Sequence, residues 1–118
     1  MKLPFKILNT CRDDQYDALF LPKVNGWLGG DAGCSIQLGQ NRILWLFGDT
    51  IIGKLDGGKR KVLFPHINNS IAITTLGSKN DMETQFYWNL KKGIPSSFFP
   101  RTPSGDDIYY WPTNGLFL

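Results

Sequence analysis

Two aspartates, Asp31 and Asp49, have the residue type and the spacing for acid–base chemistry or for binding hydroxyl groups. They lie just outside a predicted β-hairpin, whose strands at 34–38 and 42–47 flank a short Gly-Gln-Asn turn that tolerates positive φ. With that turn at 39–41, the numbers of paired residues sum to 80, and apolar residues face apolar residues. The same register places Asp31 opposite Asp49, so both carboxylates are expected at one end of the sheet.

The expected closeness of these carboxylates has a physical consequence. Directly opposed residues on paired strands have Cβ atoms about 4.5–5.5 Å apart, and like charges at that range disfavour joint ionisation without support. We expect backbone N–H groups of the turn at 29–33 or the Thr50 hydroxyl to give that support. A metal ion is disfavoured, because calcium takes six to eight oxygen ligands. Asp49 is then expected to be held by hydrogen bonds within the fold, and Asp31 to be available for chemistry or binding.

Each aspartate also has a purely structural alternative. Asp31 could accept backbone N–H bonds within the Gly-rich turn, and this alternative has equal weight with a role as general base or sugar-hydroxyl acceptor. For Asp49 a structural turn with Thr50 is favoured over a place in a binding site, because Asp and Thr after a glycine readily bond the local backbone.

The elements that position these aspartates are predicted to be antiparallel β-strands. Eight Phe, four Tyr and four Trp, with three Ala and one Glu, favour sheet over helix. Residues 70–76 and 84–90 follow the hairpin as third and fourth strands, which gives an all-β, four-stranded antiparallel sheet. Strand 42–47 is apolar on both faces, so it is expected to lie between two layers.

The chain divides into three predicted regions. Residues 1–26 form an irregular N-terminal arm with at most a short helical turn at 13–20, and residues 27–92 hold the four strands. Residues 93–118 are a linker rich in Pro and Gly, followed by a strand that begins at Ile108. The sequence ends inside that strand, which suggests a truncated chain.

Charge and cysteine content argue against several classes of function. The net charge is +3, and the basic stretch at 54–61 is interpreted as a solvated loop around Asp-Gly-Gly, without the recognition helix that nucleic-acid binding would need. Cys11 and Cys34 lack metal-site spacing, so neither a metal nor a cofactor is predicted. His66 has no acidic partner nearby in sequence and is interpreted as an ordinary loop histidine. No apolar run is long enough for a membrane span.

An ordered series of motifs extends over residues 26–118. It comprises WLGGD at 27–31, Ser35, LWLFGDT at 44–50, NSI at 69–71, and Trp111-Pro112 with Gly115. This series resembles the first blade and a half of five-bladed β-propellers, in the uncharacterised families that carry an LWLFGDT signature. Those families are similar to arabinanase, xylosidase and levansucrase-type glycoside hydrolases. The resemblance implies a first blade at 27–92 and a linker with the start of a second blade at 93–118.

The resemblance also implies roles for individual residues. Asp31 matches the general base of the similar hydrolases, and Asp49 would lie on the same face. Asn114 stands where the related pattern usually has Asp, which removes a charge from the expected site. Glu83, which is the only Glu, falls in the outer part of the first blade. Because glycoside hydrolysis needs two carboxyl groups that flank the bond, the isolated chain is predicted to be inactive.

Further residues are candidates for binding, each with an alternative. Trp27 and Trp111 near strand starts could flank a sugar pocket, although packing is the commoner role of such residues. Asn69 could contact a ligand from the start of the third strand, but hydrogen bonding within the fold is favoured.

The predicted function is the N-terminal part of a carbohydrate-active, glycoside hydrolase-like propeller without a complete catalytic set. The alternatives are a non-catalytic propeller module that binds a glycan or a protein, and a truncated product with no function of its own. A carbohydrate is the expected ligand, while neither nucleic acid nor a membrane is an expected partner. The exposed blade face is expected to self-associate or to need the missing blades. No signal peptide is visible, so a cytoplasmic location is the default, although the resembling families are often exported.

Overall fold

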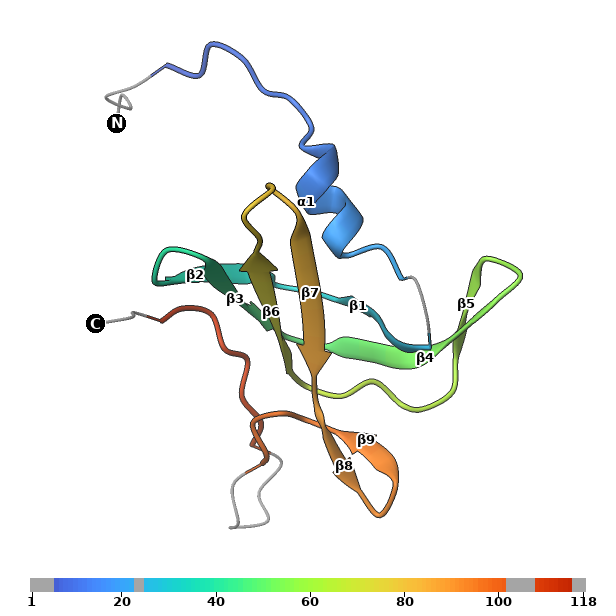
Figure 1. Ribbon diagram of the computed structural model, residues 1–118. Helices are drawn as coiled ribbons and strands as arrows, with labels where there is room; N and C mark the ends of the chain where they lie inside the picture. The colour runs from blue at the N-terminus through green and yellow to red at the C-terminus, as the bar shows by residue number, and fades with distance from the viewer. Residues whose placement is uncertain (1–5, 23–24, 102–107, 116–118) are drawn as a thin grey trace.

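The computed structural model describes residues 6–22, 25–101 and 108–115 of the chain. Its elements, in chain order, are α1 (Asp14–Leu19), β1 (Gly26–Gly30), β2 (Cys34–Leu38), β3 (Arg42–Phe47), β4 (Thr50–Asp56), β5 (Lys59–Val62), β6 (Ser70–Leu76), β7 (Met82–Tyr87), β8 (Asn89–Lys91) and β9 (Ile94–Ser96). The strands pair antiparallel in sheets of order β1-β4-β5, β2-β3-β6-β7 and β8-β9 (Figure 1). The predicted all-β, antiparallel class is confirmed.

The sheet β2-β3-β6-β7 is the predicted four-stranded sheet, and the chain forms β4 and β5 of another sheet between β3 and β6. Cys34 pairs with Leu46 and Leu38 pairs with Arg42, which confirms the predicted register. The fourth strand differs from the prediction, because it runs over Met82–Tyr87 and β8 then leaves to pair with β9. Lys92 and Gly93 both have positive φ, the geometry of a tight hairpin turn, so the predicted linker begins as a small hairpin.

The hairpin β2–β3 continues beyond its own sheet as a bent ribbon. Past the bend at residues 31–33 and 48–49, Gly30 pairs with Thr50, so β1 and β4 keep the same register before a bulge shifts it. The prediction of a simple turn at 29–33 was therefore wrong in part, because Gly29 and Gly30 belong to β1. The basic stretch at 54–61 is also not a plain loop: only its Gly-Gly tip turns, and its flanks pair as β4 and β5.

An aromatic cluster forms the core between α1 and the four-stranded sheet. Trp27 stacks on Phe86 with ring centroids 4.2 Å apart, and Phe47 lies 5.1 Å from Trp27. Phe20, which follows α1, meets the Trp45 ring edge-on at 4.9 Å. Such aromatic pairs contribute about 0.5–1.5 kcal/mol each beyond the area they bury. The predicted N-terminal arm therefore contributes Phe20 to the core that packs on the sheet.

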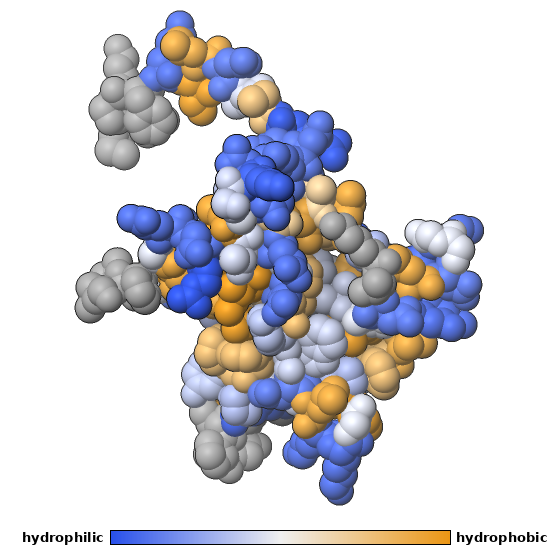
Figure 2. All heavy atoms as spheres, in the orientation of Figure 1, coloured by the Kyte–Doolittle hydropathy of each residue, from blue (hydrophilic) through white to orange (hydrophobic). Residues whose placement is uncertain are grey.

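The short helix α1 matches the helical turn predicted at 13–20. It begins after Asp13, whose carboxylate accepts hydrogen bonds from the backbone N–H groups of Gln15 and Tyr16. In Figure 1 the helix lies over β7, and Figure 2 shows polar atoms on the helix with apolar atoms beneath it. No helix among the described residues is long and apolar enough to cross a membrane.

The C-terminal segment covers part of the opposite face of the sheet. Gly115 lies so close to Ile36 that any side chain at position 115 would collide with it, and Leu46 on that face is buried. The strand predicted from Ile108 is not formed over 108–115, and residues 116–118 lie outside the described residues. Pro112 has no N–H to donate, and the carbonyl of Tyr110 accepts from a side chain instead of a strand.

Candidate functional site

Asp31 and Asp49 meet at the bend of the ribbon. The backbone N–H of Asp31 donates to the Asp49 carbonyl at 3.1 Å, and Gly48 N–H donates to the Asp31 carbonyl at 3.0 Å. These bonds carry the strand register across the bend, so the predicted opposition of the two aspartates is confirmed. Gly48 lies directly under the Asp31 side chain, because a Cβ there would collide with the Asp31 carboxylate.

A cavity of about 570 Å³ opens at this bend. Its ionisable lining consists of two acidic and two basic side chains, Asp31, Asp49, Arg60 and His66. Its apolar lining consists of Phe20, Trp27 and Ile51. A cavity with apolar walls and a few convergent polar groups is the usual form of a small-molecule site. Within the described residues, no three His, Cys, Asp or Glu side chains gather in a way that could hold a metal ion.

Side chains from distant parts of the sequence hold the Asp49 carboxylate. Trp111 donates its indole N–H to Asp49 Oδ1 at 3.2 Å, and His66 Nε2 lies 3.8 Å from Asp49 Oδ2. The expected support from backbone N–H groups or the Thr50 hydroxyl was wrong, because Thr50 donates to the Gly48 carbonyl instead. His66 therefore does have an acidic partner, contrary to the interpretation from sequence.

The Asp31 carboxylate is exposed, and it accepts no hydrogen bond from any residue that the structure describes. The structural alternative, in which Asp31 accepts N–H bonds in the Gly-rich turn, is not what forms. A carboxylate oxygen without an internal donor can accept from a ligand hydroxyl at no cost to the fold.

A buried chain of hydrogen bonds fixes the backbone beneath Asp31. The Thr50 hydroxyl donates to the Gly48 carbonyl at 2.9 Å, so its single proton is used and Ser70 must donate to Thr50 across 2.8 Å. Ser70 in turn accepts the indole N–H of Trp27 at 3.2 Å. Thr50 and Ser70 are completely buried, so this chain stabilises the bend rather than contacting a ligand.

Trp27 is a wall of the site and not an exposed stacking platform. It is 8% exposed, its N–H is bonded to Ser70, and one face is stacked on Phe86. Trp111 is 51% exposed and contacts the site through its bond to Asp49.

Asn69 ties the C-terminal segment to the site. This completely buried side chain accepts from Phe99 N–H at 2.7 Å and donates to the carbonyls of Phe99 and Tyr110. The favoured alternative, hydrogen bonding within the fold, is what forms, and it brings Trp111 beside Asp49. Asn114 is exposed, bonds the Gly115 N–H, and does not line the cavity.

Arg60 and His66 are the site residues that sequence reasoning missed. For Arg60 a signal existed, since Asp-Gly-Gly between chain segments is typical of a tight hairpin. In that hairpin Arg60 pairs with Leu55. Leu55 and Ile51 are four residues apart on β4 and lie on the same face of the sheet, so Arg60 shares that face with Ile51. For His66 no local signal exists. It reaches Asp49 because the next residue, Ile67, forms an isolated bridge with Thr50.

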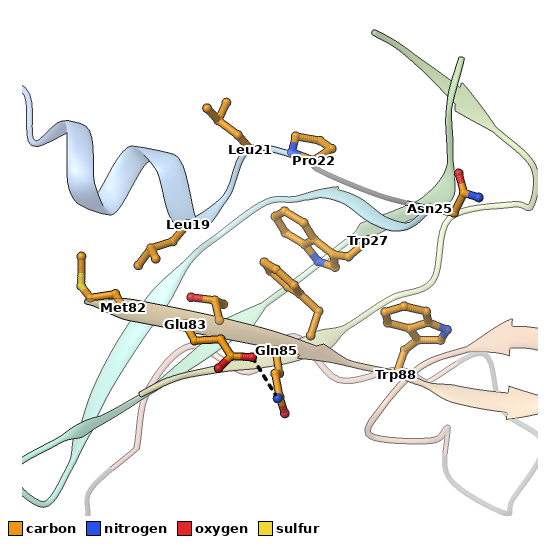
Figure 3. A pocket seen from close by; sticks show the side chains of 11 residues that line it. Leu19, Leu21, Pro22, Asn25, Trp27, Met82, Glu83, Gln85 and Trp88 are labelled. Carbon is orange, nitrogen blue, oxygen red and sulfur yellow. Dashed lines mark hydrogen bonds between the residues drawn. The ribbon is translucent and has the colours of Figure 1, made fainter. Parts of the chain in front are cut away.

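A second cavity, of about 500 Å³, lies between α1 and β7 (Figure 3). Its walls are mostly apolar, and in Figure 3 Leu19, Trp27 and Trp88 line it. Glu83 and Gln85 at its edge are exposed and bond each other. Trp27 contributes to the lining of both cavities.

The fold and the site define an all-β antiparallel protein with a mixed acidic and basic pocket at a ribbon bend. Residues 13–118 match the family described as a domain of unknown function, DUF5005, and the chain belongs to that family. The same comparisons found no match among curated proteins and none among solved structures.

Proposed function

We propose that the Asp31–Asp49 pocket binds a carbohydrate, and that the chain contributes to a glycoside hydrolase-like β-propeller. The observation that carries this proposal is that the Asp31 carboxylate, which accepts no hydrogen bond from a described residue, lies beside the bonded Asp49 carboxylate in a cavity with aromatic walls. Carboxylates accept hydrogen bonds from sugar hydroxyls, while apolar walls suit the C–H faces of a sugar ring.

The four-stranded antiparallel sheet supports the propeller part of the proposal. Propeller blades are four-stranded antiparallel sheets that pack around a channel, and β2-β3-β6-β7 has this number and direction of strands, with β4 and β5 inserted in the chain between β3 and β6. Large apolar side chains on the surface are consistent with neighbouring blades that would cover them. They include Leu90, Ile94, Ile108, Tyr109 and Tyr110.

In this proposal the two aspartates have different tasks. Asp31 is the general base or the acceptor of a sugar hydroxyl, and Asp49 shapes the pocket while Trp111 and His66 hold it. Hydrolysis also needs a second carboxyl group across the glycosidic bond. Glu83 does not line this pocket, since it lies at the other cavity. The chain alone is therefore expected to bind without turnover, and another blade would supply the acid.

The second candidate function is non-catalytic glycan binding. It is favoured by the position of Glu83 and by Asn114, which is neutral and outside the cavity. Hydrolysis of a bound glycan by the assembled protein would distinguish the enzyme from the binding module.

Calorimetric titration of the chain with a panel of neutral and acidic oligosaccharides tests the proposal. We expect binding that Asp31→Asn weakens by about tenfold or more, since a hydrogen bond to a charged group contributes about 1.5–3 kcal/mol. Asp56→Asn is the matched control, because Asp56 is exposed at the far end of β4. Absence of binding across the panel, or equal affinity in Asp31→Asn, would refute the proposal.

A further inference from the structure

Arg60 is a cation that lines the pocket. It lies on β5 at the edge of the sheet β1-β4-β5, and its side chain crosses β4 toward β1. A Cβ built on Gly29 would lie 3.6 Å from Arg60 Nη1, which is an ordinary van der Waals distance, so the guanidinium lies beside Gly29 of β1. Among the residues that the structure describes, no carboxylate forms an ion pair with Arg60.

The hairpin β4–β5 separates Arg60 from the neighbouring lysines. Successive residues of a strand point to opposite faces of the sheet, so Lys59 and Lys61 point away from the face that carries Arg60. Only Arg60 of these three lines the cavity. The basic stretch therefore contributes one placed cation, Arg60, to the pocket.

The pocket thus offers two kinds of recognition, one on the wall that carries Asp31 and one on the wall that carries Arg60. Asp31 accepts hydrogen bonds from hydroxyls, and Asp49 has its own partners in Trp111 and His66. The guanidinium of Arg60 has five N–H donors in a planar fork, which matches a carboxylate or a sulfate group. A ligand that satisfies both walls carries hydroxyl groups and one anionic group.

We infer that the pocket recognises an acidic sugar, with the anionic group on Arg60 and a hydroxyl on Asp31. This inference rests on the proposed carbohydrate function and names its ligand class. The anionic group can be the carboxylate of a uronic acid or a sulfate ester, since both present oxygens to the same fork. A neutral sugar would use only the Asp31 wall and leave the guanidinium in solvent.

The test compares affinities for matched acidic and neutral sugars. The probes are oligomers of galacturonic and glucuronic acid, their galactose and glucose counterparts, and a 6-sulfated galactose oligomer. We expect the chain to prefer an acidic probe over its neutral counterpart by about tenfold or more, the usual gain from a charge-assisted pair. Arg60→Met abolishes this preference. Lys61→Met, with the same charge change on the opposite face, keeps it, and the uronate and sulfate arms identify which group is bound.

Each other outcome counts against a defined part of the account. If neutral and acidic probes bind equally and Asp31→Asn weakens both, the acidic-sugar inference fails while the carbohydrate proposal stands. If Arg60→Met and Lys61→Met reduce the preference equally, diffuse charge explains it and the Arg60 site is wrong. If no probe binds, both the inference and the proposed function fail.

Discussion

The two cavities that Trp27 lines are similar in volume and different in composition. The pocket at the ribbon bend collects acidic and basic side chains from the bend, from β5 and from the loop before β6. The groove between α1 and β7 is lined mostly by apolar side chains and by Glu83 and Gln85 at its edge. Volume therefore does not distinguish a candidate site here. The distinguishing feature is polar groups that converge from segments far apart in sequence.

The bend pocket also differs in how rigidly it is built. Asn69 and the chain from Trp27 through Ser70 to Thr50 are buried and fully bonded, and they hold the backbone on which the aspartates sit. The Asp31 carboxylate is the exception, since it accepts no hydrogen bond from the described residues although the Asp31 backbone is bonded on both sides. A preorganised frame with one unsatisfied exposed group is the arrangement expected of a binding site.

Trp27→Ala is expected to have the largest effect, because it removes the wall that both cavities share. The change deletes the stack on Phe86 and leaves Ser70 without its indole donor. We expect a loss of about 3–5 kcal/mol in the free energy of unfolding, measured by urea denaturation. Trp111→Ala is the control, since that side chain is half exposed. Equal losses in the two variants would mean that Trp27 is not the shared wall.

Asn69→Ala tests the bend pocket independently of the apolar groove. It leaves Phe99 N–H and the carbonyls of Phe99 and Tyr110 without their side-chain partner, which costs about 1–3 kcal/mol of stability. Because Asn69 also positions Trp111, sugar affinity is expected to fall with it. Asn68→Ala, at a half-buried neighbour, is the control and is expected to change stability less. An unchanged affinity in Asn69→Ala would show that the C-terminal segment plays no part in the pocket.

Trp111→Phe makes the smallest change, because it deletes one donor and keeps an aromatic ring. Asp49 loses its indole bond and keeps its contact with His66. We expect stability to change by less than about 1 kcal/mol, as is usual for an exposed position, while sugar affinity falls by about tenfold or less. Thermal melting and calorimetry on the same sample measure the two effects. A large loss of stability with unchanged affinity would make Trp111 a packing residue only.

The predictable part of this fold is the part encoded locally. Alternating residues and a Gly-Gln-Asn turn specify the register of β2 and β3, and the same arithmetic placed Asp31 against Asp49. The strand Ser70–Leu76 was predicted with its observed bounds for the same reason.

The rest depended on contacts that sequence spacing does not encode. His66 and Trp111 reach Asp49 through tertiary contacts across 17 and 62 positions, so neighbouring residues gave no sign of them. Arg60 was missed for another reason. The high charge of residues 54–61 led to the prediction of a loop, although the Asp-Gly-Gly turn within them already indicated a hairpin. Turn chemistry was the more reliable signal, because it fixes which residues pair and hence which face each side chain takes.

The indole N–H resonances of the four tryptophans test the central claim most directly. Trp111 reports on the bend pocket through its bond to Asp49, Trp88 reports on the apolar groove, and Trp45 is bonded to Thr74 in the sheet. The account predicts that an acidic oligosaccharide added to ¹⁵N-labelled chain shifts the Trp111 signal, leaves Trp88 and Trp45 in place, and shifts Trp111 in Asp31→Asn only at a concentration about tenfold higher or more. A shift of Trp88 with an unmoved Trp111 would place the ligand in the apolar groove and contradict the account.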